Sequence, residues 1–432
     1  MNILIIGQCT LHWGRMEFGN IGNYYIIEPL VRELHKTFPG AKIKTTFQMS
    51  KRFCDDEKIE VLPMELYYGF NANDLEIAEK EYKIALSYSK SGKTEETTPY
   101  IQAVQNADLV IDFSGDIWGD NADFLGDNRF LVGLYKDRTA QLLGKKTAMI
   151  AGSPGPFSPY KNLEFAKEVF ENFDLVTNRE SISRKVLEKY DFNLEKTFDL
   201  SCPAFLFEPK KNIDISSIEP GLSNQNEKII GLIICGWNFL NGPFDLWPRK
   251  NEDYDFIIDP IISFLDENID TQLCLLSHSN GFIPGKEPFE LIHGRDYPIM
   301  KQIEEILVEK GYQKRIIMLD GVYDTWTTKA IITHFDMLIS GRIHGAVAGM
   351  SQFVPTVVID YGHEPKAHKL KGFAKEANMI KLVAEPDRKE DILEKINSCY
   401  TNLEKIKQEL LTSIPQVQEK ARKNFNLLKE LF

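Results

Sequence analysis

The feature that most constrains the fold of this chain is a repeated alternation of short apolar segments with longer segments that have helical spacing. Residues 2–7 form a short apolar run, and residues 24–38 follow with apolar side chains at helical intervals. The pattern then predicts strands at residues 107–113, 146–151 and 174–177 and helices at residues 163–173 and 181–190. This alternation is typical of an α/β fold, in which helices cover both faces of a parallel sheet.

The alternation occurs in two regions of the chain. Between residues 208 and 228 the apolar content falls and Pro, Ser, Asn and Gly accumulate, which is typical of a linker. Beyond it, strands are expected at residues 229–234, 272–277, 315–319, 337–340 and 356–359, and a helix at 300–310. A chain of 432 residues can form two cores.

We therefore expect three parts. An N-terminal α/β domain spans residues 1–210, a C-terminal α/β domain spans residues 225–388, and a helical segment at residues 389–432 packs back on the N-terminal domain. Residues 51–106 contain an acidic helical stretch without a clear strand, which indicates an insertion or a lid.

Composition excludes several classes of function. The chain has 51 Lys+Arg against 63 Asp+Glu, a formal charge of −12, which disfavours nucleic acid as a partner. Residues 1–7 lack the basic start of a signal peptide, and no apolar run is long enough for a transmembrane helix, so we expect a cytoplasmic protein. The six cysteines include no C-x-x-C pair, so a zinc site is not indicated.

Three apparent motifs fail on inspection. Residues 91–94 (SGKT) resemble the end of a P-loop, but the required first glycine is absent and no strand precedes them. The first strand is not followed by G-x-G-x-x-G, which argues against a nicotinamide cofactor. The histidines of residues 363–368 (HEPKAH) are five residues apart with a proline between them, which argues against a helical metal site.

Polar loops follow three of the predicted strands in the first region. They are residues 18–23 (FGNIGN), with Asn20 and Asn23, residues 114–120, with Ser114 and Asp116, and residues 150–157, with Ser153. Loops at the carboxyl ends of parallel strands line the ligand crevice of open α/β sheets. We expect these side chains to bind substrate, with a plain turn or a helix cap as the alternative.

Two arginines stand at strand-to-helix junctions. Arg179 begins a predicted helix, where oriented backbone N–H groups favour anions, although it could instead pair with Glu180. Arg342 and His344 lie where an apolar strand meets a helix of small residues, in the segment 337–346 (MLISGRIHGA). An arginine beside a histidine can meet a bound anion and transfer a proton near neutral pH, so we expect a catalytic site there, with Ser340, Gly341 and Gly345 contacting the substrate.

The loop at residues 361–373 carries the basic residues Lys366, Lys369 and Lys371 just after the next strand. A lysine in such a loop is usually solvated, so the residues alone do not decide which of the three enters the site.

Taken in order, the motifs G-N-I-G-N, A-D-L-V-I-D-F-S-G-D, A-G-S-P-G-P-F, T-N-R-E-S, S-G-R-I-H-G and K-L-K-G-F resemble the polysaccharide pyruvyltransferase family over roughly residues 1–380. The resemblance implies two Rossmann-like domains that face each other across a cleft, as in B-type glycosyltransferases. It matches Arg342, His344 and Arg179 to functional positions of the family and selects Lys369 among the lysines. Ser114 and Gly115 stand where the family commonly has two glycines.

The resemblance also implies a reaction. Phosphoenolpyruvate would be the co-substrate, with no other cofactor and no metal, and a cell-envelope sugar would receive a pyruvate ketal. His344 would protonate C3 of phosphoenolpyruvate, while Arg342, Arg179 and Lys369 hold its charged groups. The acceptor sugar, its attachment to a lipid, a peripheral association with the inner face of the membrane and the oligomeric state all stay open.

Two other functions fit the same pattern. A B-type glycosyltransferase would use a nucleotide sugar in a similar cleft, and a non-catalytic family member would bind glycans only. The donor that is consumed separates them.

Overall fold

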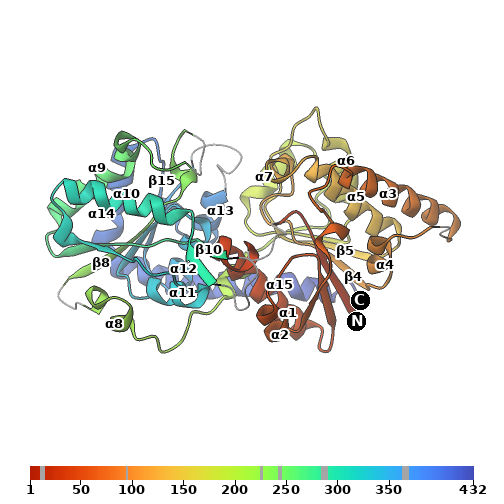
Figure 1. Ribbon diagram of the computed structural model, residues 1–432, viewed down its shortest axis with the longest axis horizontal. Coiled ribbons are helices and arrows are strands. Elements are labelled where there is room, and N and C mark those ends of the chain that lie inside the picture. Colours follow the sequence, from red (N-terminus) through yellow and green to blue (C-terminus); the bar gives the residue numbers. More distant parts are fainter. Residues whose placement is uncertain (10–14, 94–95, 224–226, 242–245, 284–289, 362–368) are drawn as a thin grey trace. The chain divides into compact units, whose positions relative to one another are not determined.

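The computed structural model describes the chain from residue 1 to residue 432 except for residues 10–14, 94–95, 224–226, 242–245, 284–289 and 362–368. Its described residues form two compact units (Figure 1). The first comprises Met1–Met16, Ile27–Pro203 and Lys420–Phe432, and the second comprises Glu17–Ile26 and Ala204–Glu419.

The first unit is built on a parallel sheet of seven strands in the order β3-β2-β1-β4-β5-β6-β7. The strands are β1 (Asn2–Ile6), β2 (Lys42–Thr45), β3 (Ile59–Val61), β4 (Leu109–Asp112), β5 (Lys146–Gly152), β6 (Leu175–Asn178) and β7 (Thr197–Asp199). The strand order reverses beside β1, so the loops after β1 and β4 meet at the point where open α/β sheets bind ligands.

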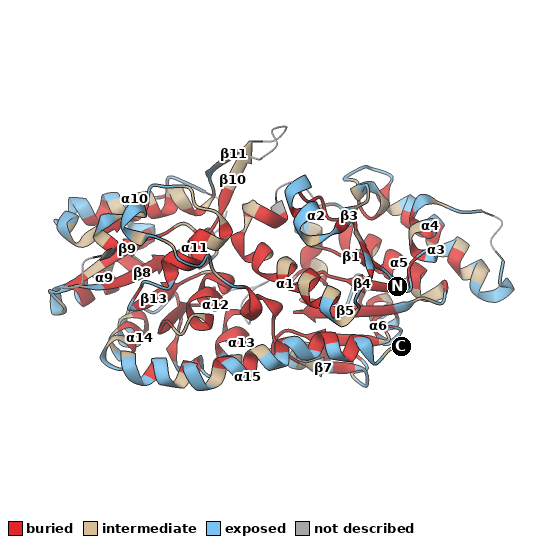
Figure 2. Ribbon diagram, turned by 90° about the horizontal axis from the view of Figure 1, so that it is seen from below, coloured by how far each residue is buried: buried red, intermediate tan, exposed pale blue. Residues whose placement is uncertain are grey.

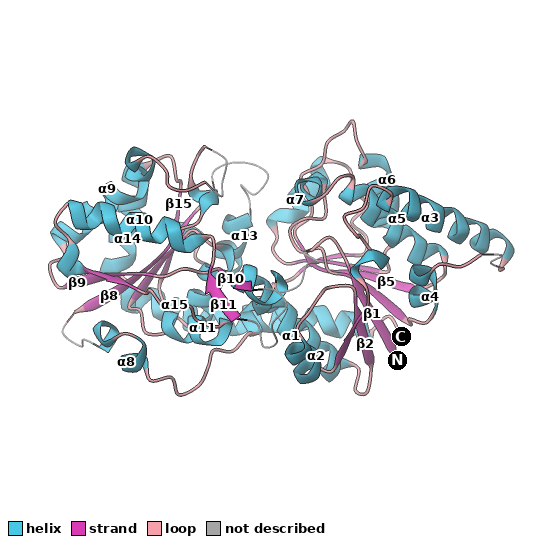
Figure 3. Ribbon diagram, viewed as in Figure 1, coloured by secondary structure: helices cyan, strands magenta, loops and turns pink. Residues whose placement is uncertain are grey.

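Helices cover this sheet, as Figure 3 shows. They are α1 (Ile21–Thr37), α2 (Lys51–Glu57), α3 (Asp74–Ser91), α4 (Pro99–Gln105), α5 (Arg129–Leu142), α6 (Leu163–Glu171) and α7 (Ile182–Lys189). The side chain of Trp118 anchors the loop after β4 in an aromatic core, with its ring centroid 5.4 Å from Phe130 and 5.9 Å from Phe157. Residues 114–120 are therefore tied to the fold through a fully buried indole.

The second unit is built on a parallel sheet of six strands in the order β12-β9-β8-β13-β14-β15, with a separate antiparallel pair β10-β11. The strands are β8 (Lys228–Ile233), β9 (Thr271–Leu275), β10 (Asn280–Ile283), β11 (Glu290–His293), β12 (Ile316–Met318), β13 (Met337–Ser340), β14 (Thr356–Ile359) and β15 (Val383–Ala384). The order reverses beside β8, which brings the loops after β8 and β13 together.

The helices of the second region are α8 (Ile215–Ile218), α9 (Asp255–Glu267), α10 (Asp296–Glu309), α11 (Thr325–Ile332), α12 (Ile343–Ser351), α13 (Lys369–Glu376), α14 (Lys389–Thr401) and α15 (Leu403–Lys429). Every residue of α12 is buried, as is every residue of the neighbouring strands β13 and β14 (Figure 2). A helix of small residues such as α12 can lie close to the sheet because its side chains occupy little space.

The expected α/β class with parallel sheets is confirmed in both regions. The expected role of residues 389–432 needs correction, because only Lys420–Phe432 clusters with the first unit. Helix α14 belongs to the second unit, where Lys389 pairs with Asp259 of α9 at 2.7 Å. Its apolar residues Ile392 and Ile396 are fully buried, so this helix is part of the second core.

Candidate active site

The turn between β13 and α12 is fixed by its own side chains. Ser340 Oγ accepts a hydrogen bond from the backbone N–H of Arg342 at 3.2 Å and donates one to Arg342 O at 3.0 Å. A Cβ on Gly341 would lie 2.1 Å from Asn238 Oδ1, and a Cβ on Gly345 would lie 2.7 Å from Ser340 Oγ. These glycines are required by close packing. Substrate contact by Ser340, Gly341 and Gly345 stays a prediction.

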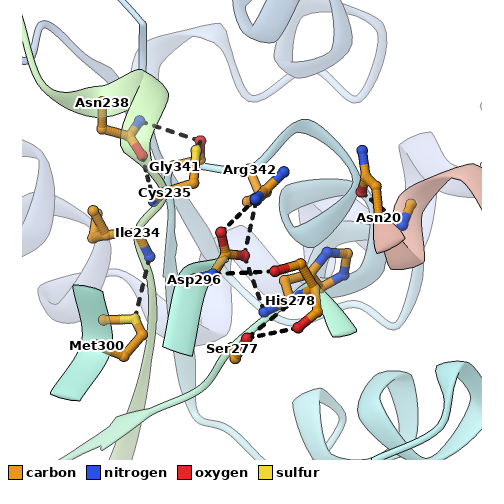
Figure 4. A network of polar contacts seen from close by, with 12 residues as sticks. Asn20, Ile234, Cys235, Asn238, Ser277, His278, Asp296, Met300, Gly341 and Arg342 are labelled. Atoms are coloured by element: carbon orange, nitrogen blue, oxygen red, sulfur yellow. Dashed lines mark hydrogen bonds and ion pairs between the residues drawn. The ribbon is translucent and has the colours of Figure 1, made fainter. Parts of the chain in front are cut away.

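Arg342 forms a partly buried ion pair with Asp296, the first residue of α10 (Figure 4). Its Nε donates to Asp296 Oδ2 at 2.9 Å, and its Nη2 donates to Asp296 Oδ1. Burial alone would lower the pKa of Arg342, but the carboxylate of Asp296, helped by Cys235 and Tyr361, raises it above its ordinary value. The guanidinium is therefore a fixed positive charge held in one orientation.

His344 lies in the first turn of α12 and is only 8% exposed. Its ring makes an edge-to-face contact with Phe373 of α13, with centroids 5.8 Å apart. On another side it touches the first turn of α1, because a Cβ on Gly22 would lie 2.4 Å from His344 Nδ1 and 2.5 Å from His344 Cβ. The imidazole is thus positioned by two helices.

The segment Glu17–Ile26 clusters with the second unit, although the sequence assigned it to the N-terminal domain at residues 1–210. The reason is tertiary packing. The ring of Tyr24 lies 4.9 Å from Trp326, and Thr325 Oγ1 donates a hydrogen bond to Glu17 O at 3.3 Å. The loop that the sequence placed in the N-terminal domain therefore belongs to the unit that carries His344.

Within this segment, Asn20 has a structural role at the start of α1. Its Oδ1 accepts a hydrogen bond from the backbone N–H of Gly22 at 3.1 Å, as a capping side chain does. Asn23 lies in the first turn of α1 and is partly buried. Both asparagines are close in sequence to Gly22, which contacts His344, and their contact with a substrate stays a prediction.

The structure separates the two lysines that it describes in the basic loop. Lys371 forms ion pairs with Asp360 at 3.1 Å and Glu385 at 2.7 Å, which is a structural role. Lys369 is fully buried at the first residue of α13, on the same helix face as Phe373, which contacts His344. Lys366 lies outside the described residues.

In the first unit, Arg179 and Ser153 come together as part of a buried cluster. Arg179 Nε donates to Ser153 Oγ at 2.8 Å, and Ser153 Oγ donates to Glu180 Oε1 at 3.2 Å. Burial raises the pKa of Glu180, while hydrogen bonds from Ser183 and the charge of Arg179 oppose this effect. The charge of Arg179 thus acts on Glu180, the carboxylate that the alternative interpretation named, and anion binding by Arg179 stays a prediction.

The other predicted residues of the first unit lie in the loop after β4. Ser114 is buried, and its Oγ accepts a hydrogen bond from the backbone N–H of Gln8 at 2.8 Å, so it joins the loops after β1 and β4. Asp116 is partly buried, and its backbone oxygen accepts from Asn121 Nδ2 at 2.7 Å. The carboxylate of Asp116 thus comes from a loop whose backbone is fixed.

Sequence reasoning missed Asp296, Asn238 and His278, which surround the turn at Arg342. Asn238 Nδ2 donates to Gly341 O and to Ile359 O, both at 3.2 Å, and the backbone N–H of His278 donates to Asp296 Oδ2 at 3.2 Å. These residues follow β8 and β9 or begin α10. In the sequence, only the position of these residues after predicted strands could have indicated them, as it indicated the polar loops of the first region.

The family model described as polysaccharide pyruvyl transferase matches residues 20–363, which is more than half of the chain and includes Arg179, Arg342 and His344. The chain belongs to this family. As a member of it, the protein is a pyruvyltransferase of polysaccharide biosynthesis.

Other known proteins are similar to this pyruvyltransferase over almost its whole length. The amylovoran biosynthesis protein AmsJ of Erwinia amylovora is 23% identical over 96% of this pyruvyltransferase and 96% of AmsJ. HepE of Anabaena, solved in complex with UDP, superposes with a TM-score of 0.58 at 12% identity over 100% of this chain and 99% of HepE. A glycosyltransferase from Rickettsia africae gives a TM-score of 0.57 at 13% identity over 99% and 98% of the two chains.

These structural likenesses confirm the expected glycosyltransferase-B-like fold class and, at such low identity, show the fold alone. Within the described part of the pyruvyltransferase, no three His, Cys, Asp or Glu side chains come together as a metal site. No described helix is long and apolar enough to cross a membrane.

Proposed function

We propose that this pyruvyltransferase takes phosphoenolpyruvate as donor and forms a pyruvate ketal on a sugar of a cell-envelope polysaccharide or of its lipid-linked precursor. One observation carries the proposal: in a chain of this family, the fixed guanidinium of Arg342 and the imidazole of His344 both stand at the start of α12. Phosphoenolpyruvate has a carboxylate, a phosphate and a C3 carbon that must be protonated, so it needs cationic groups beside a proton donor.

In the proposed reaction, two sugar hydroxyls replace the bonds that the donor loses. One sugar hydroxyl forms a C–O bond to C2 of phosphoenolpyruvate as C3 gains a proton, and the second hydroxyl forms the other C–O bond as the C2–O bond to phosphate breaks. The two hydroxyl protons end on C3, which becomes a methyl group, and on the departing phosphate. In this scheme His344 delivers the proton to C3, and Arg342 stabilises negative charge on the donor.

Lys369 and Arg179 are the two other cations that the family resemblance selected. Lys369 lies buried on the α13 face that also carries Phe373, and Phe373 contacts the His344 ring, which supports a role for this lysine beside the imidazole. Arg179 supplies a buried guanidinium in the first unit, where Ser153 fixes its orientation at 2.8 Å. Asp116 and Ser153 are proposed to contact the sugar, and Asn20 and Asn23 are proposed to bind substrate.

The test measures phosphate release from phosphoenolpyruvate with a panel of lipid-linked oligosaccharides from the source organism as acceptors. His344→Ala is expected to lower turnover by about 10²–10⁴-fold, the usual contribution of a general acid. His334→Ala is the matched control, because His334 is an exposed histidine of the same unit. Wild-type turnover in His344→Ala would refute the assignment of the proton donor.

The same assay separates the proposal from a glycosyltransferase. Release of a nucleoside diphosphate from a nucleotide sugar, with no phosphate released from phosphoenolpyruvate, would refute the proposed donor. Sugar binding without consumption of either donor would refute catalysis.

A further inference from the structure

His278 is a fully buried histidine that the proposed reaction does not yet use. It follows β9, and its backbone N–H donates to Asp296 Oδ2, the oxygen that also accepts from Arg342 Nε. Among the described residues, neither ring nitrogen of His278 has a hydrogen-bond partner. A buried polar group without a partner is unfavourable, so such a ring is expected to meet a ligand or a water molecule.

The surroundings of His278 favour an anion as that ligand. Asp296 occupies Nε and Nη2 of Arg342, which leaves Arg342 Nη1 without a hydrogen bond among the described residues. Arg342 is near enough for its charge to act on His278. Burial first, and then this charge, lower the pKa of the imidazole to about 3. The ring is therefore neutral at physiological pH and keeps one N–H donor.

Tyr25 adds a second polar group beside this ring. Its ring meets that of His278 edge-to-face with centroids 5.5 Å apart, and its hydroxyl has no hydrogen-bond partner within the described part of the chain. Tyr25 is one helical turn beyond Gly22 on α1, and Gly22 contacts His344. The first turns of α1 thus contact both His278 and His344.

We propose that His278 is a further substrate-binding residue, which donates a hydrogen bond from its ring to the phosphate group of the donor held by Arg342. Asp296 is the corresponding positioning residue, because it orients the guanidinium through two hydrogen bonds and the His278 backbone through a third. A tetrahedral phosphate suits the site, since its oxygens can accept from several donors at once. This inference rests on the proposed function for the identity of the donor.

The experiment measures binding and stability separately in the full chain. Isothermal titration calorimetry gives the affinity for phosphoenolpyruvate and for inorganic phosphate, and thermal melting gives the stability of the ligand-free protein. His278→Leu is expected to weaken both affinities by about 10–100-fold, the usual effect of losing a hydrogen bond to a charged group. His278→Gln, which keeps an N–H donor, is expected to recover part of the loss.

Stability distinguishes this role from a purely structural one. Replacing an unsatisfied buried polar ring by an apolar side chain is neutral or stabilising, so His278→Leu should leave the melting temperature unchanged or raise it. His334→Leu serves as the control and should change neither quantity, because His334 is exposed. A lower melting temperature with unchanged affinity would show a structural histidine and overturn the inference.

The two ligands separate this inference from the proposed function. If the wild type binds phosphoenolpyruvate and His278→Leu binds it equally well, the inference fails and the proposed donor stands. If the wild type binds inorganic phosphate in a His278-dependent manner but does not bind phosphoenolpyruvate, the proposed donor fails and the phosphate site stands. Binding of neither ligand by the wild type would overturn the phosphate site.

Discussion

The contact between Gly22 and His344 predicts a large loss of activity from a very small substitution. In Gly22→Ala the new Cβ would lie 2.4 Å from His344 Nδ1, 2.5 Å from its Cβ and 2.6 Å from its Cγ. Non-bonded carbon atoms prefer about 3.5–4.0 Å, so the imidazole and the α1 backbone must separate by about 1 Å. A misplacement of about 1 Å can cost about 100-fold in rate, and we expect a loss of that size in kcat.

The stability change should be modest by comparison. Overpacking a core typically lowers the free energy of unfolding by about 1–3 kcal/mol, while replacing a helical glycine by alanine raises it by about 1 kcal/mol. The expected net loss in the free energy of unfolding is therefore about 0–2 kcal/mol. The folded protein should still form, and its reduced activity would reflect the position of the histidine.

The assay compares kcat for phosphate release with the melting temperature. Gly311→Ala is the matched control, because Gly311 belongs to the same unit and its added Cβ meets no atom within 4 Å. Its φ of +93° makes alanine unfavourable there, so this variant should lose stability without losing kcat. A kcat of Gly22→Ala within about threefold of wild type would refute the argument that α1 positions His344.

Two further predictions concern other charged groups of the two units. Burial raises the pKa of Asp112 to about 7, so the folded chain binds more protons than the unfolded chain between about pH 4 and pH 7. The free energy of unfolding should therefore fall as pH rises through that range. Asp112→Asn should make this fall less steep in chemical unfolding curves, and an unchanged slope would contradict the pKa shift. Lys371→Met should lower the melting temperature because it breaks the ion pairs with Asp360 and Glu385, and it should leave the affinity for phosphoenolpyruvate within about twofold of wild type. Lys369→Met should weaken that affinity, which calorimetry measures. The reverse result would exchange the roles of the two lysines.

The sequence determined the fold class because the central strands are buried on both faces. Residues of β1, β4, β13 and β14 are almost all apolar, and such runs are visible without knowledge of their neighbours. Short strands such as β2 (KIKT), β3, β7 and β15 were missed, since two to four residues that are not all buried give no clear period. Their place in the sheet depends on pairing with strands that are distant in the sequence.

The sequence also selected the turn with Arg342 and His344, because an arginine and a histidine at a strand-to-helix junction suggest chemistry by themselves. It could not identify Asp296 as the partner of the arginine or Gly22 as the neighbour of the histidine. Those contacts join segments that are far apart in the chain, and no local pattern of apolar residues predicts them. Tertiary packing alone decided that the first turn of α1 belongs with the second unit, since the aromatic contacts of Tyr24 and Tyr25 are made only in the folded protein.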